Sequence, residues 1–331
     1  KGMENAPTVI LQSHIDMVCD KLVDVEFDFD KDPIQTYVDG DWMKAKGTTL
    51  GADDGIGVAM QLAVLESNDI QHGPLECVFT SDEETQMTGA SGMEPGFMTG
   101  DWLINLDSED EGEIFVSCAG GRSTHAVFHF EKEEAPKDYF FLQISVKGLT
   151  GGHSGDDINK KRANAIKLLA RFVYLEQEKY DVRLASFNSG KLHNAIPRDG
   201  RVVMAVPNDV KENVRADWNV FAHEVADEFY VTDTAMEFAM ESANAEKVMP
   251  ADVSRRIIMA LQGITNGVFA ICQDPALGGM VETSSNIAVV KTTDNTVDLL
   301  ASQRSNVMSN LTNQCNAVGA VLKLAGAEVE Q

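Results

Sequence analysis

Four short segments in the first third of the sequence carry a histidine or carboxylates, the side chains that bind divalent cations and transfer protons. Each segment follows the end of an apolar run, so each is predicted to lie at the end of a strand. Because sites in open α/β sheets form at strand ends, we expect these segments to build a metal site, with two metals as the favoured number. The segments are Ser13-His14-Ile15-Asp16, Gly51-Ala52-Asp53-Asp54-Gly55, Asp82-Glu83-Glu84-Thr85 and Asn105-Leu106-Asp107-Ser108.

His14 and Asp16 lie two positions apart at the end of a predicted strand. Side chains at that spacing point to the same side of a strand. Asp16 is therefore expected to accept the proton on one imidazole nitrogen of His14, while the other nitrogen binds a metal. Taken alone, the pattern is equally typical of a histidine in a turn beside a capping aspartate.

Asp53 and Asp54 precede a helix predicted over residues 55–67, which has glycine at its start. A carboxylate in this position reaches forward from exposed backbone, so Asp53 is expected to bridge two cations with its two oxygens. The alternative is an ordinary helix N-cap, which suits Asp54 in particular.

Glu83 and Glu84 are adjacent carboxylates that face different directions on an extended or turning backbone. This arrangement allows one of them to bind metal while the other acts as a general base beside it. A solvated acidic turn is the alternative. Asp107 is the carboxylate nearest to the end of its apolar run, and we prefer it as a ligand over the acidic residues that follow.

The composition excludes several classes of protein. With 331 residues and a formal net charge of −25, the chain lacks the clustered positive charge that binding to nucleic acid or an anionic membrane requires. No apolar run approaches the roughly 18 to 20 residues that span a bilayer, and the sequence shows no signal-peptide hydrophobic region, so we predict a cytoplasmic protein. Five widely spaced cysteines argue against a disulfide framework and against a thiolate zinc site.

The pattern of elements changes once along the chain. Up to about residue 120, short β-type runs alternate with helix-like stretches, which is typical of parallel βαβ layers. After a Gly-rich turn, strands and helices follow in the order β-α-β-β-α-β, which is typical of a ferredoxin-like unit, and a further helix and strand set suggests that this unit is duplicated. We predict an α/β protein with a catalytic domain over residues 1–120 and an α+β domain over residues 121–331.

Taken with these segments, the chain resembles the aminoacyl-histidine dipeptidases, the carnosinase-like Xaa-His dipeptidases of the dizinc exopeptidase superfamily. The resemblance runs essentially from end to end, and its motifs are specific. They are Leu11-Gln12-Ser13-His14-Ile15-Asp16-Met17-Val18, residues 46–57, Thr80-Ser81-Asp82-Glu83-Glu84, residues 148–155, Asn194-Ala195-Ile196-Pro197 and Val281-Glu282-Thr283-Ser284.

The resemblance implies a zinc-exopeptidase-like catalytic domain, mostly a parallel sheet flanked by helices, with a ferredoxin-like lid and dimerisation domain. It implies two Zn²⁺ per subunit, with Mn²⁺ or Co²⁺ as substitutes. His14 and Asp107 are expected on one metal, Glu84 on the other, and Asp53 between them.

The resemblance also implies the reaction. A metal-bound water activated by Glu83 attacks the peptide carbonyl, and Glu83 then protonates the leaving amine, while Asp16 supports His14. The expected substrates are short unblocked dipeptides, including Xaa-His dipeptides of the carnosine type.

Three residues of the second domain are expected to act on the substrate. His153, in a Gly-His-Ser-Gly turn, is expected to donate a hydrogen bond to the developing oxyanion, and its alternative is a loop histidine that satisfies a helix N-terminus. Asn194 and Arg304 are expected to hold the substrate backbone and carboxylate, although an exposed salt bridge explains Arg304 equally well. A homodimer is expected.

The family pattern is incomplete at both ends of this sequence. A further histidine ligand, expected in a segment that follows the lid, has no match in this chain, so the sequence is expected to be part of a longer enzyme. Two alternative enzyme functions are a related tripeptidase and an N-acyl amino acid deacylase, because the metal site alone does not distinguish them. The non-enzyme alternative is a truncated lid or dimerisation module.

Overall fold

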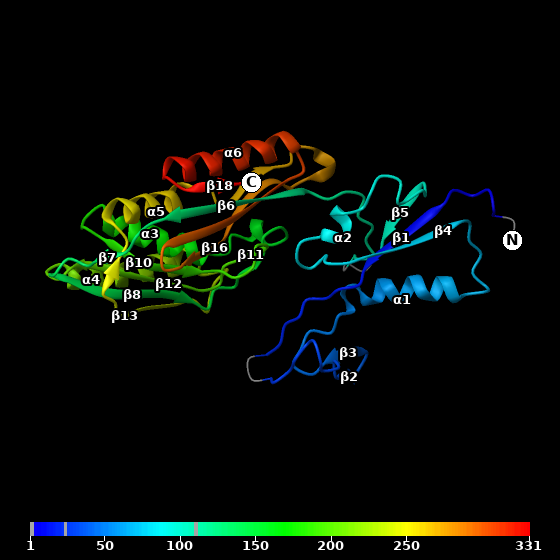
Figure 1. Ribbon diagram of the computed structural model, residues 1–331, viewed down its shortest axis with the longest axis horizontal. Helices are drawn as coiled ribbons and strands as arrows, with labels where there is room; N and C mark the ends of the chain where they lie inside the picture. The colour runs from blue at the N-terminus through cyan, green and yellow to red at the C-terminus, as the bar shows by residue number, and fades with distance from the viewer. Residues whose placement is uncertain (1–2, 23–24, 109–111) are drawn as a thin grey trace. The chain divides into compact units, whose positions relative to one another are not determined.

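The computed structural model describes residues 3–22, 25–108 and 112–331. The chain divides into two compact units, Lys1–Val116 and Ser117–Gln331. Each unit has its own sheet and its own helices (Figure 1).

The first unit is built on a three-stranded parallel sheet with the strand order β4-β1-β5. Leu11 in the central strand pairs with Cys77 on one side and Ile104 on the other. Since all three strands run in the same direction, their carboxyl ends reach the same edge. The elements are β1 (Val9–His14), the β2–β3 hairpin (Thr36–Asp39 and Trp42–Ala45), α1 (Ala52–Glu66), β4 (Leu75–Thr80), α2 (Thr88–Ser91) and β5 (Trp102–Asn105).

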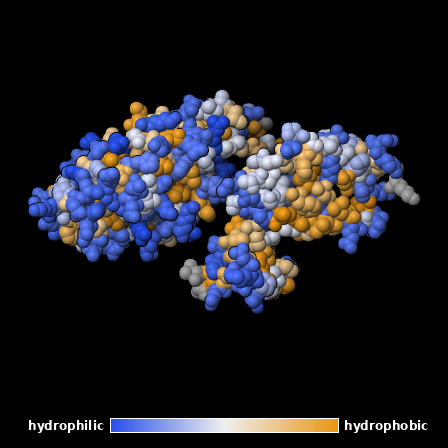
Figure 2. Space-filling model, viewed as in Figure 1, coloured by the Kyte–Doolittle hydropathy of each residue, from blue (hydrophilic) through white to orange (hydrophobic). Residues whose placement is uncertain are grey.

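Helix α1 contacts β1 through small and polar side chains. Gly57 is buried, and the amide of the fully buried Gln61 lies 2.6 Å from the Ser13 hydroxyl. The apolar residues Ile56, Met60, Leu62 and Leu65 are 49–57% exposed, and Figure 2 shows hydrophobic surface over this helix.

The second unit is built on a nine-stranded antiparallel sheet. Its strand order is β13-β8-β12-β10-β16-β17-β6-β18, and β15 pairs with β16. The longest pairing joins β17 to β6, from Thr296 opposite His129 to Ser305 opposite Gly120. The strands are β6 (Gly120–His129), β8 (Tyr139–Lys147), β10 (Arg183–Ser189), β12 (Gly200–Pro207), β13 (Glu237–Ser242), β15 (Gly267–Ile271), β16 (Val281–Thr292), β17 (Thr296–Ser305) and β18 (Glu328–Glu330), with short pairs β7 (Glu133–Glu134) with β14 (Lys247–Val248) and β9 (Gly152–His153) with β11 (Ala195–Ile196).

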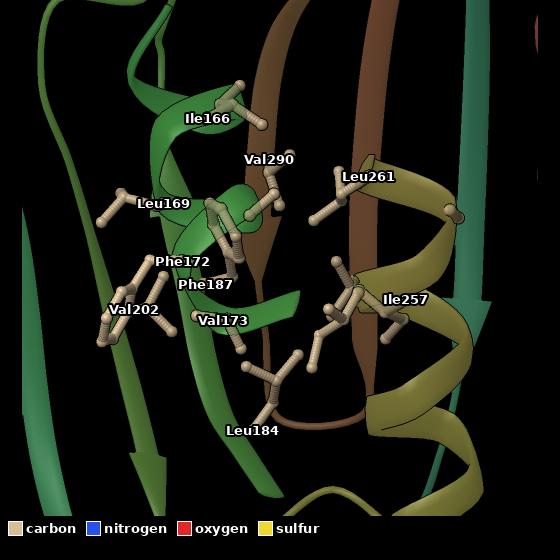
Figure 3. Packing of buried hydrophobic residues seen from close by; sticks show 14 of the residues in the cluster. Ile166, Leu169, Phe172, Val173, Leu184, Phe187, Val202, Ile257, Leu261 and Val290 are labelled. Carbon is tan, nitrogen blue, oxygen red and sulfur yellow. The ribbon is translucent and has the colours of Figure 1, made fainter. Parts of the chain in front are cut away.

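One hydrophobic cluster joins this sheet to four helices. Figure 3 shows the α3 residue Phe172 beside the strand residues Phe187 and Val202, with Ile257 of α5 packed in the same cluster. Phe172 also meets the ring of Trp218 from α4 edge-on, with 4.7 Å between ring centroids. The helices are α3 (Ala165–Gln177), α4 (Lys211–Glu228), α5 (Ala251–Gly263) and α6 (Met308–Leu324), with 3₁₀ turns at Ile158–Lys160 and Pro275–Leu277.

The coarse fold prediction is confirmed: the protein is a mixed α/β chain with a parallel sheet. The second unit includes the predicted order β-α-β-β-α-β as β8-α3-β10-β12-α4-β13, although the sequence did not locate the residues of β13, and β15 was not predicted. Neither strand has a long apolar run in the sequence, and each forms by hydrogen bonding to a neighbouring strand of the sheet. Within the described residues, no helix is both long and apolar enough to cross a membrane.

Candidate metal centre

His14 lies at the centre of a group of carboxylates in the first unit. It ends β1 with its side chain 1% exposed, and its Nε2 lies 2.9 Å from Asp53 Oδ1 and 3.6 Å from Asp107 Oδ1. One possible ligand atom from each of these three residues lies within 4.8 Å of the others. The spacing suits a cation between one imidazole and two carboxylates.

Glu83 and Glu84 form a second group with the same histidine. Their carboxylate oxygens and a ring nitrogen of His14 also lie within 4.8 Å of one another. Both glutamates follow β4, whose last residue, Thr80, pairs with His14 in the parallel sheet. The shared sheet edge therefore brings together side chains that are about 70 positions apart in the sequence.

The carboxylate of Asp16 holds the main chain of the two glutamates and also lies at ion-pair distance from the imidazole. Its oxygens accept hydrogen bonds from the main-chain N–H groups of Glu83 and Glu84, both at 3.1 Å. Nδ1 of His14 lies 3.0 Å from the Asp16 main-chain oxygen and 3.5 Å from its carboxylate. The main-chain oxygen of Asp16 is thus the nearer acceptor for a proton on Nδ1, and Nε2 faces the carboxylates of Asp53 and Asp107.

Asp54 is a positioning residue that the sequence interpretation assigned only to helix capping. Its carboxylate is 1% exposed and accepts hydrogen bonds from the main-chain N–H of His14 at 3.3 Å and of Gly57 at 3.0 Å. It therefore ties the start of α1 to the end of β1. The sequence shows only that a second aspartate stands beside a ligand candidate. Its contact with His14, 40 positions away, is seen only in the folded structure.

The protonation equilibria reflect crowded negative charge. Burial, followed by the nearby charge of Asp53, raises the pKa of Asp107 to about 7. Burial alone would lower the pKa of His14, but the hydrogen bond to Asp53 and the charges of Asp107 and Glu83 raise it overall. Burial and the charges of Asp53 and Glu83 also raise the pKa of Glu84. A divalent cation would relieve this repulsion, so the donor set fits a metal.

The three predicted substrate residues all lie in the second unit. Nε2 of His153 is 3.4 Å from Nη2 of Arg304, so these two side chains meet. Asn194 joins the same turn through its main-chain oxygen, which accepts a hydrogen bond from Ser154 N at 2.7 Å. The structure thus groups the three residues within one unit.

The fold and the cluster define a mixed α/β protein with a candidate metal centre at the carboxyl edge of a parallel sheet. The family model "Peptidase family M20/M25/M40" matches residues 10–305. The chain belongs to this peptidase family.

Two similar proteins match nearly the whole chain. The cytosol non-specific dipeptidase of Escherichia coli is 41% identical over 330 residues, which is 99% of this chain and 68% of that protein. A crystal structure of aminoacylhistidine dipeptidase from Vibrio alginolyticus has a TM-score of 0.77 and 42% identity, and the match covers 100% of this chain and 67% of the other.

Proposed function

We propose that this protein is a metal-dependent dipeptidase that hydrolyses short unblocked dipeptides, including Xaa-His dipeptides. The observation that carries the proposal is the convergence of one imidazole and four carboxylates at the edge of the first unit's sheet. The two similar proteins, a non-specific dipeptidase and an aminoacylhistidine dipeptidase by name, support the choice of substrate class.

We assign the cation ligands within this cluster. His14 and Asp107 would hold one Zn²⁺, Glu84 would hold a second, and Asp53 would serve both. Imidazole and carboxylate donors suit zinc, with manganese or cobalt as substitutes. When bound, the two cations polarise the substrate carbonyl and make water more acidic.

Glu83 is the proposed general base. It removes a proton from the attacking water and returns that proton to the nitrogen of the leaving amine, so one carboxylate serves both halves of the reaction. Asp16 fixes its main chain, since Glu83 N is one of the two donors to that carboxylate. A base placed this way lies close to the cations without being required as a ligand.

The second unit is proposed to act as the lid and dimerisation domain. Its strand order β13-β8-β12-β10 and the further set β16-β17-β6-β18 support a duplicated ferredoxin-like arrangement. His153 is proposed to donate to the developing oxyanion, and Asn194 and Arg304 to hold the backbone and carboxylate of the dipeptide. A cytoplasmic homodimer completes the proposal.

The test compares bound metal with turnover in two variants. Glu83→Gln is expected to keep the metal content of the wild type and to lose turnover by about 10²-fold or more, because only the proton transfer is removed. Asp53→Ala is expected to lose metal as well as turnover. Metal is measured by elemental analysis after dialysis, and turnover with an Xaa-His dipeptide, a tripeptide and an N-acyl amino acid.

Glu94→Gln is the matched control, because Glu94 is an exposed glutamate in the same unit. It should leave metal content and turnover unchanged. Wild-type turnover in Glu83→Gln would refute the proposed base. Faster hydrolysis of the tripeptide or the N-acyl amino acid than of the dipeptide would refute the proposed substrate class.

A further inference from the structure

The turn that carries His153 is fixed by its main chain. His153 N donates to Asp157 Oδ2 at 2.9 Å, and Asp157 N donates to the His153 oxygen at 3.0 Å. Ser154 N donates to the Asn194 oxygen at 2.7 Å, and the short strand β9 pairs with β11 beside it. The backbone of this turn therefore sets the positions of the side chains that follow His153.

A buried carboxylate closes the loop around this turn. Asp233 is 3% exposed, and it accepts hydrogen bonds from Thr150 N at 2.8 Å and from Ala163 N at 3.0 Å. These two donors stand on either side of His153 in the chain. The loop is thus anchored at both ends as well as at its centre.

The imidazole of His153 lies between a carboxylate and a guanidinium. Nδ1 is 2.7 Å from Asp156 Oδ2, and Nε2 is 3.4 Å from Arg304 Nη2. An ionised carboxylate only accepts hydrogen bonds and a guanidinium only donates them. Both neighbours therefore favour the same tautomer, with the proton on Nδ1 and the lone pair on Nε2. The main-chain N–H of Asp156 also approaches Nδ1, but at 3.4 Å it is the weaker contact.

Gly155 makes room for this arrangement. A Cβ atom at residue 155 would lie 3.1 Å from Cε1 of His153 and 3.5 Å from Nη1 of Arg304. The first distance is shorter than an ordinary van der Waals contact, so a side chain here would press on the imidazole. The absence of a side chain lets Asp156 reach back across the turn to Nδ1.

We infer that Asp156 is a positioning residue that holds His153 in the Nδ1–H tautomer and directs its Nε2 toward Arg304. A substrate oxygen that approaches Arg304 then meets Nε2 and no other ring nitrogen. Donation from Nε2 to a substrate oxygen requires the doubly protonated ring, and in that form Nδ1–H keeps its bond to Asp156, so Asp156 orients the ring identically with and without a proton on Nε2. The catalytic consequence rests on the proposed function of His153, whereas the tautomer does not.

The tautomer is measured directly by ¹⁵N NMR of histidine-labelled protein, at a pH where the ring is neutral. The His153→Gln variant identifies the His153 signals among those of the seven histidines. In the wild type, Nδ1 should give the signal of a protonated ring nitrogen and Nε2 that of an unprotonated one. In Asp156→Ala, the Nε2–H tautomer should become substantially populated. A wild-type ring protonated on Nε2 would overturn the inference.

Turnover provides the second readout. Asp156→Ala should lower kcat about 10- to 100-fold with KM within about twofold, because a misoriented group affects the transition state more than binding. Asp156→Glu, which keeps the acceptor, should recover part of this loss. The control is Asp227→Ala, an exposed aspartate on α4, and it should change neither readout. An unchanged kcat in Asp156→Ala, when His153→Gln itself is impaired, would refute the positioning role.

Failure of the proposed function has a different signature. If His153→Gln retains wild-type turnover, His153 has no catalytic role, yet the NMR result still decides the tautomer. If His153→Gln is inactive, the tautomer is as inferred and Asp156→Ala lowers kcat, the function and the positioning role stand together.

Discussion

Replacing Asp16 by asparagine should disturb the positions of the proposed metal ligands without removing any of them. Asp16 is not a proposed ligand, but its carboxylate binds the main-chain N–H groups of Glu83 and Glu84. Asparagine keeps one acceptor oxygen and turns an amide N–H group toward the second donor. One of the two hydrogen bonds is therefore lost, and the two glutamates are less well fixed relative to His14.

The expected size of this effect follows from the lost bond. A hydrogen bond to a charged group contributes about 1.5–3 kcal/mol. Since the Asp16 side chain is 27% exposed, water compensates part of this, and we expect about 1.5 kcal/mol. That corresponds to about a tenfold weaker metal affinity, the lower end of the roughly 10- to 100-fold range for residues that orient metal ligands.

The assay is competition between the protein and a chelator of known zinc affinity, at one pH, for the wild type and Asp16→Asn. The control is Asp41→Asn, which makes the same chemical change at an exposed turn of the same unit. A change of less than about twofold in Asp16→Asn would refute the reasoning, because the lost bond would then have no effect on the ligands. If Asp41→Asn lowered the zinc affinity equally, the effect would come from the change in net charge and not from the lost hydrogen bond.

Three further perturbations test other parts of the structure. Gly57→Ala should weaken zinc binding in the same chelator assay, because its Cβ would overlap the Asp54 carboxylate that holds His14 N; unchanged affinity would contradict this contact. Asn164→Ala should lower the free energy of unfolding by about 3 kcal/mol, measured with urea, because its side chain caps α3 and also donates to the Ile287 oxygen; a loss below about 1 kcal/mol would mean that these bonds are replaced. Burial lowers the pKa of Lys167 to about 8, so the folded state loses this proton before the unfolded state does, whose lysine titrates near 10.4. The free-energy cost of burying the charged Lys167 ammonium is complete below pH 8 and decreases as the pH rises toward 10.4. The free energy of unfolding of the wild type should therefore rise relative to that of Lys167→Met over this pH window. A constant difference between the two proteins would contradict the lowered pKa of Lys167.

The candidate metal residues other than Asp53 were predictable because the sheet is parallel, whereas Asp53 lies at the start of α1 and not at the predicted strand end. His14 and Asp107 follow strands whose carboxyl ends share one edge, and Glu83 and Glu84 follow the third. The apolar runs located these strand ends without any knowledge of the pairing. The roles assigned to the individual ligands stay predictions until metal is seen bound.

The remaining details depended on contacts that the sequence does not show. The carboxylate of Asp16 was expected to face His14 and lies 3.5 Å from its Nδ1, but its two shorter contacts, at 3.1 Å, are with main-chain N–H groups of the turn after β4, which the sequence does not show. Asp54 differs from an ordinary cap only by its bond to His14 N. The apolar residues of α1 follow a helical pattern, yet close contact with β1 uses Gly57 and Gln61.

The second unit shows the same limit. Its long strands and helices carry clear apolar patterns, and they were predicted. Strand β13 is short and gains its hydrogen bonds only from β8, while β15 pairs with β16 through an irregular register. Asp156 gave no signal in the sequence, because an acidic residue after a glycine is common on an acidic surface.

The most direct measurement of the central claim is a crystal structure of the zinc-loaded protein with anomalous data collected at the zinc edge. We expect two peaks beside His14, with Asp107 and Glu84 on different ions and both oxygens of Asp53 engaged. Peaks at other residues, or no peak within bonding distance of His14 Nε2, would contradict this expectation.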